Sequence, residues 1–137
     1  MKLIFCIDKN KGMMFGGKRQ SRDKILYENL LARIKGSKLW MSSYSAPLFS
    51  GEGEILIDDN YEAKAEENDY CFIEDKGYQI EDCKEIIIYK WNRLYPSDKM
   101  LDIDLKANGF KLISKRDFKG NSHDKVTEEI YEREIVK

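Results

Sequence analysis

The chain has 137 residues, 42% of them hydrophobic, and it carries 24 basic and 25 acidic side chains. This length suits one domain that buries about two thirds of the surface of its unfolded chain. The opposite charges balance, so no overall positive field attracts DNA or an acidic membrane, and we expect neither as a partner. An RNA partner would need a local basic patch.

The apolar start of the chain, residues 3–7, is too short for a signal peptide, and no apolar run approaches the roughly 20 residues of a membrane span. We therefore expect a cytoplasmic protein. Its three cysteines, Cys6, Cys71 and Cys83, are widely spaced, which favours reduced structural thiols over disulfides or a metal pair. The single histidine, His123, excludes a histidine-built zinc site and a two-metal nuclease.

The first third of the chain predicts a strand, a loop and a helix. Residues 2–8 form an apolar run of strand length, which indicates a strand buried inside a sheet. Residues 9–20 hold three glycines among basic side chains, and we expect a long mobile loop with an apolar tip. Residues 21–35 follow a helical period, with Ser21 as the cap and Gly36 at the end.

The rest of the chain predicts mainly strands. We expect strands at residues 38–41, 54–58, 70–73 and 83–91. The first strands alternate with helical stretches, which argues for parallel crossovers. A helical turn should precede Phe49, and residues 60–69 should form a loop or a surface helix. Residues 111–118 and 125–134 should pair as an antiparallel hairpin, whereas residues 92–108 show no clear period. No linker divides the chain, so residues 1–137 should form a single α/β domain.

This order of elements resembles dihydrofolate reductase. The matching segments are residues 2–8 with Gly12 and Met13 for the first strand and mobile loop, 19–23 for the helix start, 38–41 for the strand before the cofactor turn, and 118–133 for the closing hairpin. Asp23 falls where an acidic residue of the family contacts the pterin. The resemblance implies a mixed β-sheet with one main amphipathic helix and a C-terminal antiparallel hairpin.

The NADPH-binding motifs of the family are missing. A reductase holds the cofactor phosphates with a Gly-Arg/Lys-x-Thr turn after the second strand and a Gly-Gly pair that opens a later helix. Here these positions read Ser42-Ser43-Tyr44 and Glu74-Asp75, whose carboxylates would repel a pyrophosphate. We expect no cofactor and no NADPH-dependent reductase activity. The chain is similar in this respect to small dihydrofolate-reductase-like proteins that sometimes carry the name ribonuclease Z, although one histidine cannot supply the zinc motif of that nuclease family.

A basic cluster surrounds the first loop and the helix start. Mobile N–H groups, a helix N-terminus and guanidinium groups suit a phosphate or a carboxylate, although a solvated basic loop is the alternative. Asp23 could accept hydrogen bonds from a purine or pterin edge, or favour the helix dipole. Trp91 could stack on a base or pack in the core, and Arg93 is free to reach a ligand. The predicted ligand-binding residues are Lys18, Arg19, Arg22, Asp23, Trp91 and Arg93.

We predict no catalytic residues and no metal site. His123 adjoins Ser122, but no oxyanion feature accompanies it, so we expect a histidine that stabilises a turn or lies on the surface. The spaced carboxylates of Asp58, Asp59, Asp98, Asp102 and Asp104 could bind Mg²⁺, yet acids in loops are usually solvated.

The sequence leads to one main hypothesis. It is a non-catalytic protein that senses or sequesters a small anionic, nucleotide-like ligand in a vestigial reductase cleft, in the manner of the viral proteins with which phages absorb nucleotide signals. The first alternative is an enzyme, reductase-like or hydrolytic, that acts on a pterin or nucleotide. The weaker alternative is an RNA-binding module that uses the basic loop. Self-association into a homo-oligomer is left open.

Overall fold

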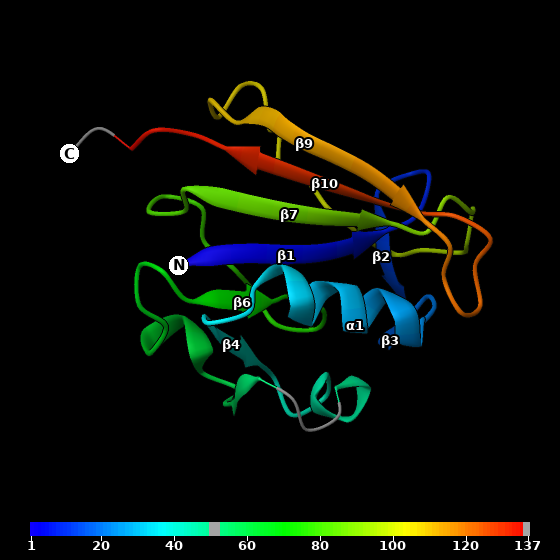
Figure 1. Ribbon diagram of the computed structural model, residues 1–137, viewed down its shortest axis with the longest axis horizontal. Helices are drawn as coiled ribbons and strands as arrows, with labels where there is room; N and C mark the ends of the chain where they lie inside the picture. The colour runs from blue at the N-terminus through cyan, green and yellow to red at the C-terminus, as the bar shows by residue number, and fades with distance from the viewer. Residues whose placement is uncertain (50–52, 136–137) are drawn as a thin grey trace.

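The computed structural model describes residues 1–49 and 53–135. A seven-stranded sheet with the strand order β5-β4-β6-β1-β7-β10-β9 lies at its centre (Figure 1). Its strands are β1 (Lys2–Ile7), β4 (Lys38–Met41), β5 (Glu54–Ile57), β6 (Tyr70–Phe72), β7 (Glu85–Lys90), β9 (Lys111–Phe118) and β10 (Val126–Glu132). The mixed α/β fold predicted from the sequence is therefore confirmed.

Strand β1 occupies the middle of the sheet, as its apolar sequence predicted. It pairs in parallel with β6 on one side and with β7 on the other. Successive side chains point to opposite faces. Ile4 packs in the core that contains the helix residues, whereas Leu3, Phe5 and Ile7 pack in a second core on the other face. Both faces of the sheet are thus covered.

The C-terminal hairpin is also confirmed. Strands β9 and β10 pair in antiparallel fashion, and β10 pairs antiparallel with β7, so the parallel part of the sheet ends there. This pairing matters for function because alternate residues of β10 then share a face with alternate residues of β7. Glu129 lies opposite Ile88 on the face that also carries Ile7.

Helix α1 (Lys24–Arg33) covers one face of the sheet (Figure 1). Leu26, Tyr27 and Leu30 anchor it in the core on that side. After Ile34 the chain leaves the helix through Gly36, whose φ of 92° suits a residue without a Cβ. The helix is shorter than the predicted range of residues 21–35.

The predicted helix cap was wrong. Asp23, rather than Ser21, caps α1, and its carboxylate accepts hydrogen bonds from the N–H groups of Ile25 and Leu26. A carboxylate at this position satisfies unpaired helix donors and also interacts favourably with the helix dipole. Ser21 lies outside the helix, where its hydroxyl contacts His123.

The segment expected to be a mobile loop forms a β-hairpin. Strands β2 (Gly12–Phe15) and β3 (Lys18–Arg19) pair around Gly16 and Gly17, whose φ values of 59° and 75° fit a tight two-residue turn. A third short strand, β8 (Lys99–Met100), completes this small sheet. Met13 and Met14 are buried in the core, whereas the next residue, Phe15, is exposed.

Two short helices complete the described ranges. Helix η1 (Ala46–Leu48) confirms the turn expected before Phe49. Helix η2 (Tyr61–Ala63) lies in the segment expected to be a loop or surface helix, although Tyr61 is buried. No helix within residues 1–49 and 53–135 is long and apolar enough to cross a membrane.

Candidate functional site

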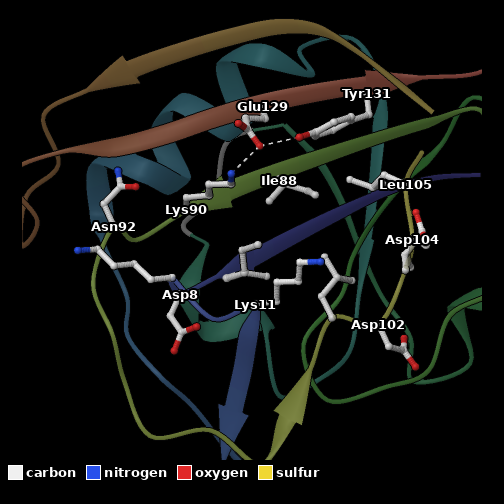
Figure 2. A pocket seen from close by; sticks show the side chains of 14 residues that line it. Asp8, Lys11, Ile88, Lys90, Asn92, Asp102, Asp104, Leu105, Glu129 and Tyr131 are labelled. Atoms are coloured by element: carbon white, nitrogen blue, oxygen red, sulfur yellow. Dashed lines mark hydrogen bonds and ion pairs between the residues drawn. The ribbon is translucent and has the colours of Figure 1, made fainter. Parts of the chain in front are cut away.

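A cavity of about 710 Å³ opens on the sheet face opposite α1 (Figure 2). We call it the open pocket. It is built where β1 and β7 end, between β10 and the segment of residues 101–105. Its volume lies within the roughly 300–1,000 Å³ that is usual for small-molecule sites.

Apolar side chains form the base and one wall of the open pocket. Ile7 and Ile88 come from the sheet, and Leu101, Ile103 and Leu105 come from the segment that crosses it. Leu101 and Ile103 are also buried in the core on this face, so the wall is anchored. An aromatic or aliphatic part of a ligand could therefore be shielded from water there.

A hydrogen-bonded group of three side chains forms the opposite wall. Glu129 is 4% exposed, and its Oε1 accepts from Nζ of Lys90 at 3.0 Å and from the Tyr131 hydroxyl at 2.8 Å (Figure 2). Burial and then the hydrogen bond to Glu129 raise the pKa of Tyr131 above its usual value, so its hydroxyl keeps its proton. Lys90 stays 37% exposed at the side chain and faces the cavity.

Two further lysines, Lys9 and Lys11, lie in the turn after β1. Figure 2 shows the side chain of Lys11 extended from this turn into the pocket. The buried carboxylate of Asp8 holds the turn, because its Oδ1 accepts from the N–H groups of Asn10 and Gly12 at 2.8 Å each. The ion pairs of the described residues involve other cations, so both ammonium groups are available to an anion.

Acidic side chains line the remaining edge. Asp102 and Asp104 are exposed and stand across the pocket from Lys90 and Asn92 (Figure 2). One oxygen of Asp102 accepts from the Tyr78 hydroxyl at 2.8 Å. The pocket therefore mixes lysines and carboxylates, with Glu129 bonded to Lys90 on one side and Asp102 and Asp104 on the other. This arrangement suits a ligand with an anionic group and several hydrogen-bond donors.

The region expected to hold the ligand is packed with protein side chains. We call it the closed cleft. On the α1 side of the sheet, Cys6, Arg19, Glu74 and Trp91 border a cavity of only about 10 Å³. That volume is at the limit for a single water molecule. The closed cleft has no room for a pterin or a base in this conformation.

Asp23 is fully engaged beside the closed cleft. It is 1% exposed and, besides capping α1, accepts from the N–H groups of Asn121 and Ser122 at 2.9 Å and from Nδ1 of His123 at 3.0 Å. Burial alone would raise the pKa of Asp23, but these hydrogen bonds outweigh it and hold the pKa below its usual value. The carboxylate therefore ties the 119–124 loop to the helix.

His123 is buried rather than on the surface, and its contact with Asp23 stabilises the loop that contains it. Its ring is 3% exposed and stacks on Trp91 with centroids 4.7 Å apart, while Nε2 lies 3.0 Å from the Ser21 hydroxyl and 3.1 Å from that of Tyr95. Ser21, His123 and Asp23 thus have the contacts of a nucleophile, base and orienting acid. The cavity that Ser21 borders is about 10 Å³, which is too small to hold an acyl substrate in this conformation.

Glu74 does not face an open phosphate site. Its carboxylate accepts from Nε and Nη2 of Arg19 at 3.0 Å each and from the Ser45 hydroxyl at 2.7 Å. Nearby, the Ser42 hydroxyl donates to Asp75 at 2.7 Å. Protein groups therefore pair with one another at both positions where the resemblance placed cofactor phosphates.

Among solved structures, the chain is similar to a dihydrofolate reductase from Enterococcus faecalis complexed with NADP(H) and RAB-propyl. The TM-score is 0.62, and the alignment covers 96% of this chain and 95% of that chain. The chain has the dihydrofolate reductase fold. At 13% sequence identity the likeness extends to the fold alone. No family model and no curated protein matches the sequence.

Within the dihydrofolate reductase fold, the six predicted ligand-binding residues do not meet in one cavity. Arg19 and Trp91 border the closed cleft. Lys18, Arg22 and Arg93 are exposed and line neither the closed cleft nor the open pocket.

Sequence reasoning missed the residues of the open pocket. Lys90, Glu129 and Tyr131 carried a usable signal, since period-two spacing places alternate residues of paired strands on one face. Lys11 was noted only as part of a basic loop. The sequence could not predict that residues 101–105 cover this face of the sheet, because residues 92–108 show no regular period.

Proposed function

We propose that the protein binds a small anionic, nucleotide-like ligand in the open pocket, and that it senses or sequesters this ligand without transforming it. The observation that carries the proposal is a cavity of about 710 Å³ with apolar walls, bordered by Lys9 and Lys11, which form no ion pair among the described residues. The proposal keeps the ligand class inferred from the sequence and moves its site to the other face of the sheet.

The chemistry of the lining supports a nucleotide-like ligand. The walls built from Ile88, Leu101 and Leu105 can enclose a base, and Lys9 and Lys11 can neutralise a phosphate. A lysine ammonium on its flexible side chain acts as a point charge rather than as a rigid fork, so it tolerates several phosphate positions.

The contacts already made by Glu129 support binding without turnover. Glu129 is a buried carboxylate that lines the open pocket, and its Oε1 already accepts from Lys90 and Tyr131. A general base must be able to reach and accept a substrate proton. Because Lys90 and Tyr131 already occupy Oε1 of Glu129, this carboxylate acts as a structural anchor of the wall.

Two double variants test the proposal and its location together. Lys9→Ala with Lys11→Ala removes two charges from the open pocket, whereas Lys18→Ala with Arg22→Ala removes two exposed charges near the closed cleft. Binding of a panel of nucleoside mono-, di- and triphosphates is measured by calorimetry. We expect the first pair to weaken binding at least tenfold, as loss of one charge-assisted hydrogen bond worth roughly 1.5–3 kcal/mol requires, and the second to change it little. The reverse ranking, or no binding by the wild-type protein, would contradict the proposal.

A further inference from the structure

We infer that the open pocket recognises hydroxyl groups beside the anionic group of its ligand, so that it prefers a ribose phosphate to its dideoxy analogue. The inference rests on the proposed function and names the part of the ligand that decides selectivity. It follows from the hydrogen bonds already made by three lining residues, Asn92, Lys90 and Tyr131, because these bonds fix which groups remain to meet a ligand.

Tyr131 can only accept a hydrogen bond from a ligand. Its hydroxyl has one proton, which it donates to Oε1 of Glu129 at 2.8 Å. An ionised carboxylate can only accept, so the direction of this bond is fixed. The remaining lone pairs of the phenol oxygen are therefore what Tyr131 offers in the open pocket.

Asn92 is restricted in the same way. Its Nδ2 donates to the carbonyl oxygen of Lys125 at 3.1 Å and to the hydroxyl oxygen of Thr127 at 2.9 Å. The carbonyl can only accept, and the Thr127 hydroxyl donates its own proton to Asp117 at 2.6 Å, so both contacts require the nitrogen of Asn92. The amide oxygen is left, and Figure 2 shows it on the side nearer Lys90.

Lys90 lies between these two acceptors (Figure 2). One N–H group of Lys90 donates to Glu129, with Nζ and Oε1 3.0 Å apart, and the other two can donate to a ligand anion. The wall thus presents one anchored cation flanked by oxygens that need donors. A phosphate with neighbouring hydroxyls satisfies all three groups, whereas a ligand with acceptors alone would leave the oxygens of Asn92 and Tyr131 unpaired when it displaces water.

Nucleotides and free sugar phosphates share this chemistry, so the test uses both. The wild-type protein is titrated with matched ribo-, 2′-deoxy- and 2′,3′-dideoxynucleotides and with ribose 5-phosphate. We expect the ribonucleotide to bind about tenfold or more tightly than the dideoxy analogue, with the 2′-deoxy form between them. Binding of ribose 5-phosphate would assign recognition to the sugar phosphate, and its failure beside nucleotide binding would show that the base is also required.

A variant separates hydroxyl recognition from a structural effect. Tyr131→Phe keeps the ring and removes the accepting oxygen, so it should weaken binding of the ribonucleotide more than binding of the dideoxy analogue and thus reduce the preference for ribose. Tyr70→Phe is the matched control, because the Tyr70 hydroxyl also donates to a glutamate, Glu85, at 2.8 Å but lines no part of the open pocket. Equal affinity for ribo and dideoxy ligands, or an unchanged preference in Tyr131→Phe, would overturn the inference while leaving the proposed function intact. If no nucleotide binds at all, the proposed function fails first.

Discussion

The guanidinium group of Arg19 donates two hydrogen bonds to the carboxylate of Glu74, each 3.0 Å long. Arg19 also donates to the carbonyl oxygen of Tyr44 at 3.1 Å and lies 4.3 Å from the centre of its ring. The pair connects strand β3 to the end of β6 and to the turn after β4. It therefore joins the small sheet to the large one and closes the cleft in which a ligand had been expected.

Breaking this ion pair should destabilise the protein. Glu74→Ala would leave the Arg19 guanidinium, whose side chain is 20% exposed, without its carboxylate, and we expect a loss of about 3 kcal/mol in the free energy of unfolding, measured with urea. The double variant Arg19→Met with Glu74→Leu should recover most of that loss. Lys64→Ala, which breaks the more exposed pair with Asp58, is the control. A loss in Glu74→Ala no greater than in Lys64→Ala would show that the pair does not hold the two sheets together.

NADPH should not bind at the closed cleft. Arg19 is already paired with Glu74, and the Ser42 hydroxyl with Asp75, so a pyrophosphate would meet two carboxylates and would have to displace their partners. A fluorescence titration with NADPH should show no saturable binding, and NADPH should not be oxidised in the presence of dihydrofolate. Micromolar affinity with dihydrofolate-dependent oxidation would contradict this expectation.

The stability of the protein should fall in acid because of Asp23. An unfolded aspartate titrates near pH 4. Burial raises the pKa of folded Asp23, but its hydrogen bonds outweigh burial and hold the pKa below that of the unfolded chain. Its stabilisation is therefore complete above about pH 4 and is lost as the pH falls toward the folded pKa. Urea unfolding across this range should show a smaller acid-induced loss in Asp23→Asn than in the wild type. Asp124→Asn, which removes an exposed carboxylate from the same loop, is the control and should alter the curve less.

The 119–124 loop should tolerate no side chain at Gly120. A Cβ there would collide with the carboxylate of Asp23, which cannot move without losing its bonds to Asn121 and Ser122. We expect Gly120→Ala to cost about 1–3 kcal/mol. At Gly77 the nearest atom to a new Cβ is 3.9 Å away, so Gly77→Ala should be nearly neutral in the same thermal or urea assay. Equal stabilities of the two variants would argue against the tight packing described for Asp23.

The strands and the main helix could be predicted because their own residues determine them. The apolar run of β1 and the helical spacing of Leu26 and Leu30 are local patterns, and tertiary packing agrees with them. The segment of residues 9–20 was mistaken because glycines and lysines are typical of loops, whereas burial of Met13 and Met14 depends on pairing with the distant strand β8.

The site was harder to predict because it depends on contacts across the chain. The Asp23 carboxylate could cap a helix or meet a ligand on sequence grounds, and the choice was decided by a loop about one hundred residues later. Arg19 was read as a ligand-binding cation, yet its partner Glu74 is 55 residues away. The open pocket requires residues from β1, β7, β10 and the 101–105 segment, and no local period predicts that combination.

The location of the ligand is tested most directly by mapping backbone amide chemical shifts while a nucleotide is titrated into isotope-labelled protein. The account predicts that the perturbed residues surround the open pocket, including Lys9, Lys11, Asn92 and Tyr131, and that Ser21, Trp91 and His123 are unaffected. Perturbations centred on Arg19, Trp91 and the start of α1 would place the ligand in the closed cleft and contradict the account.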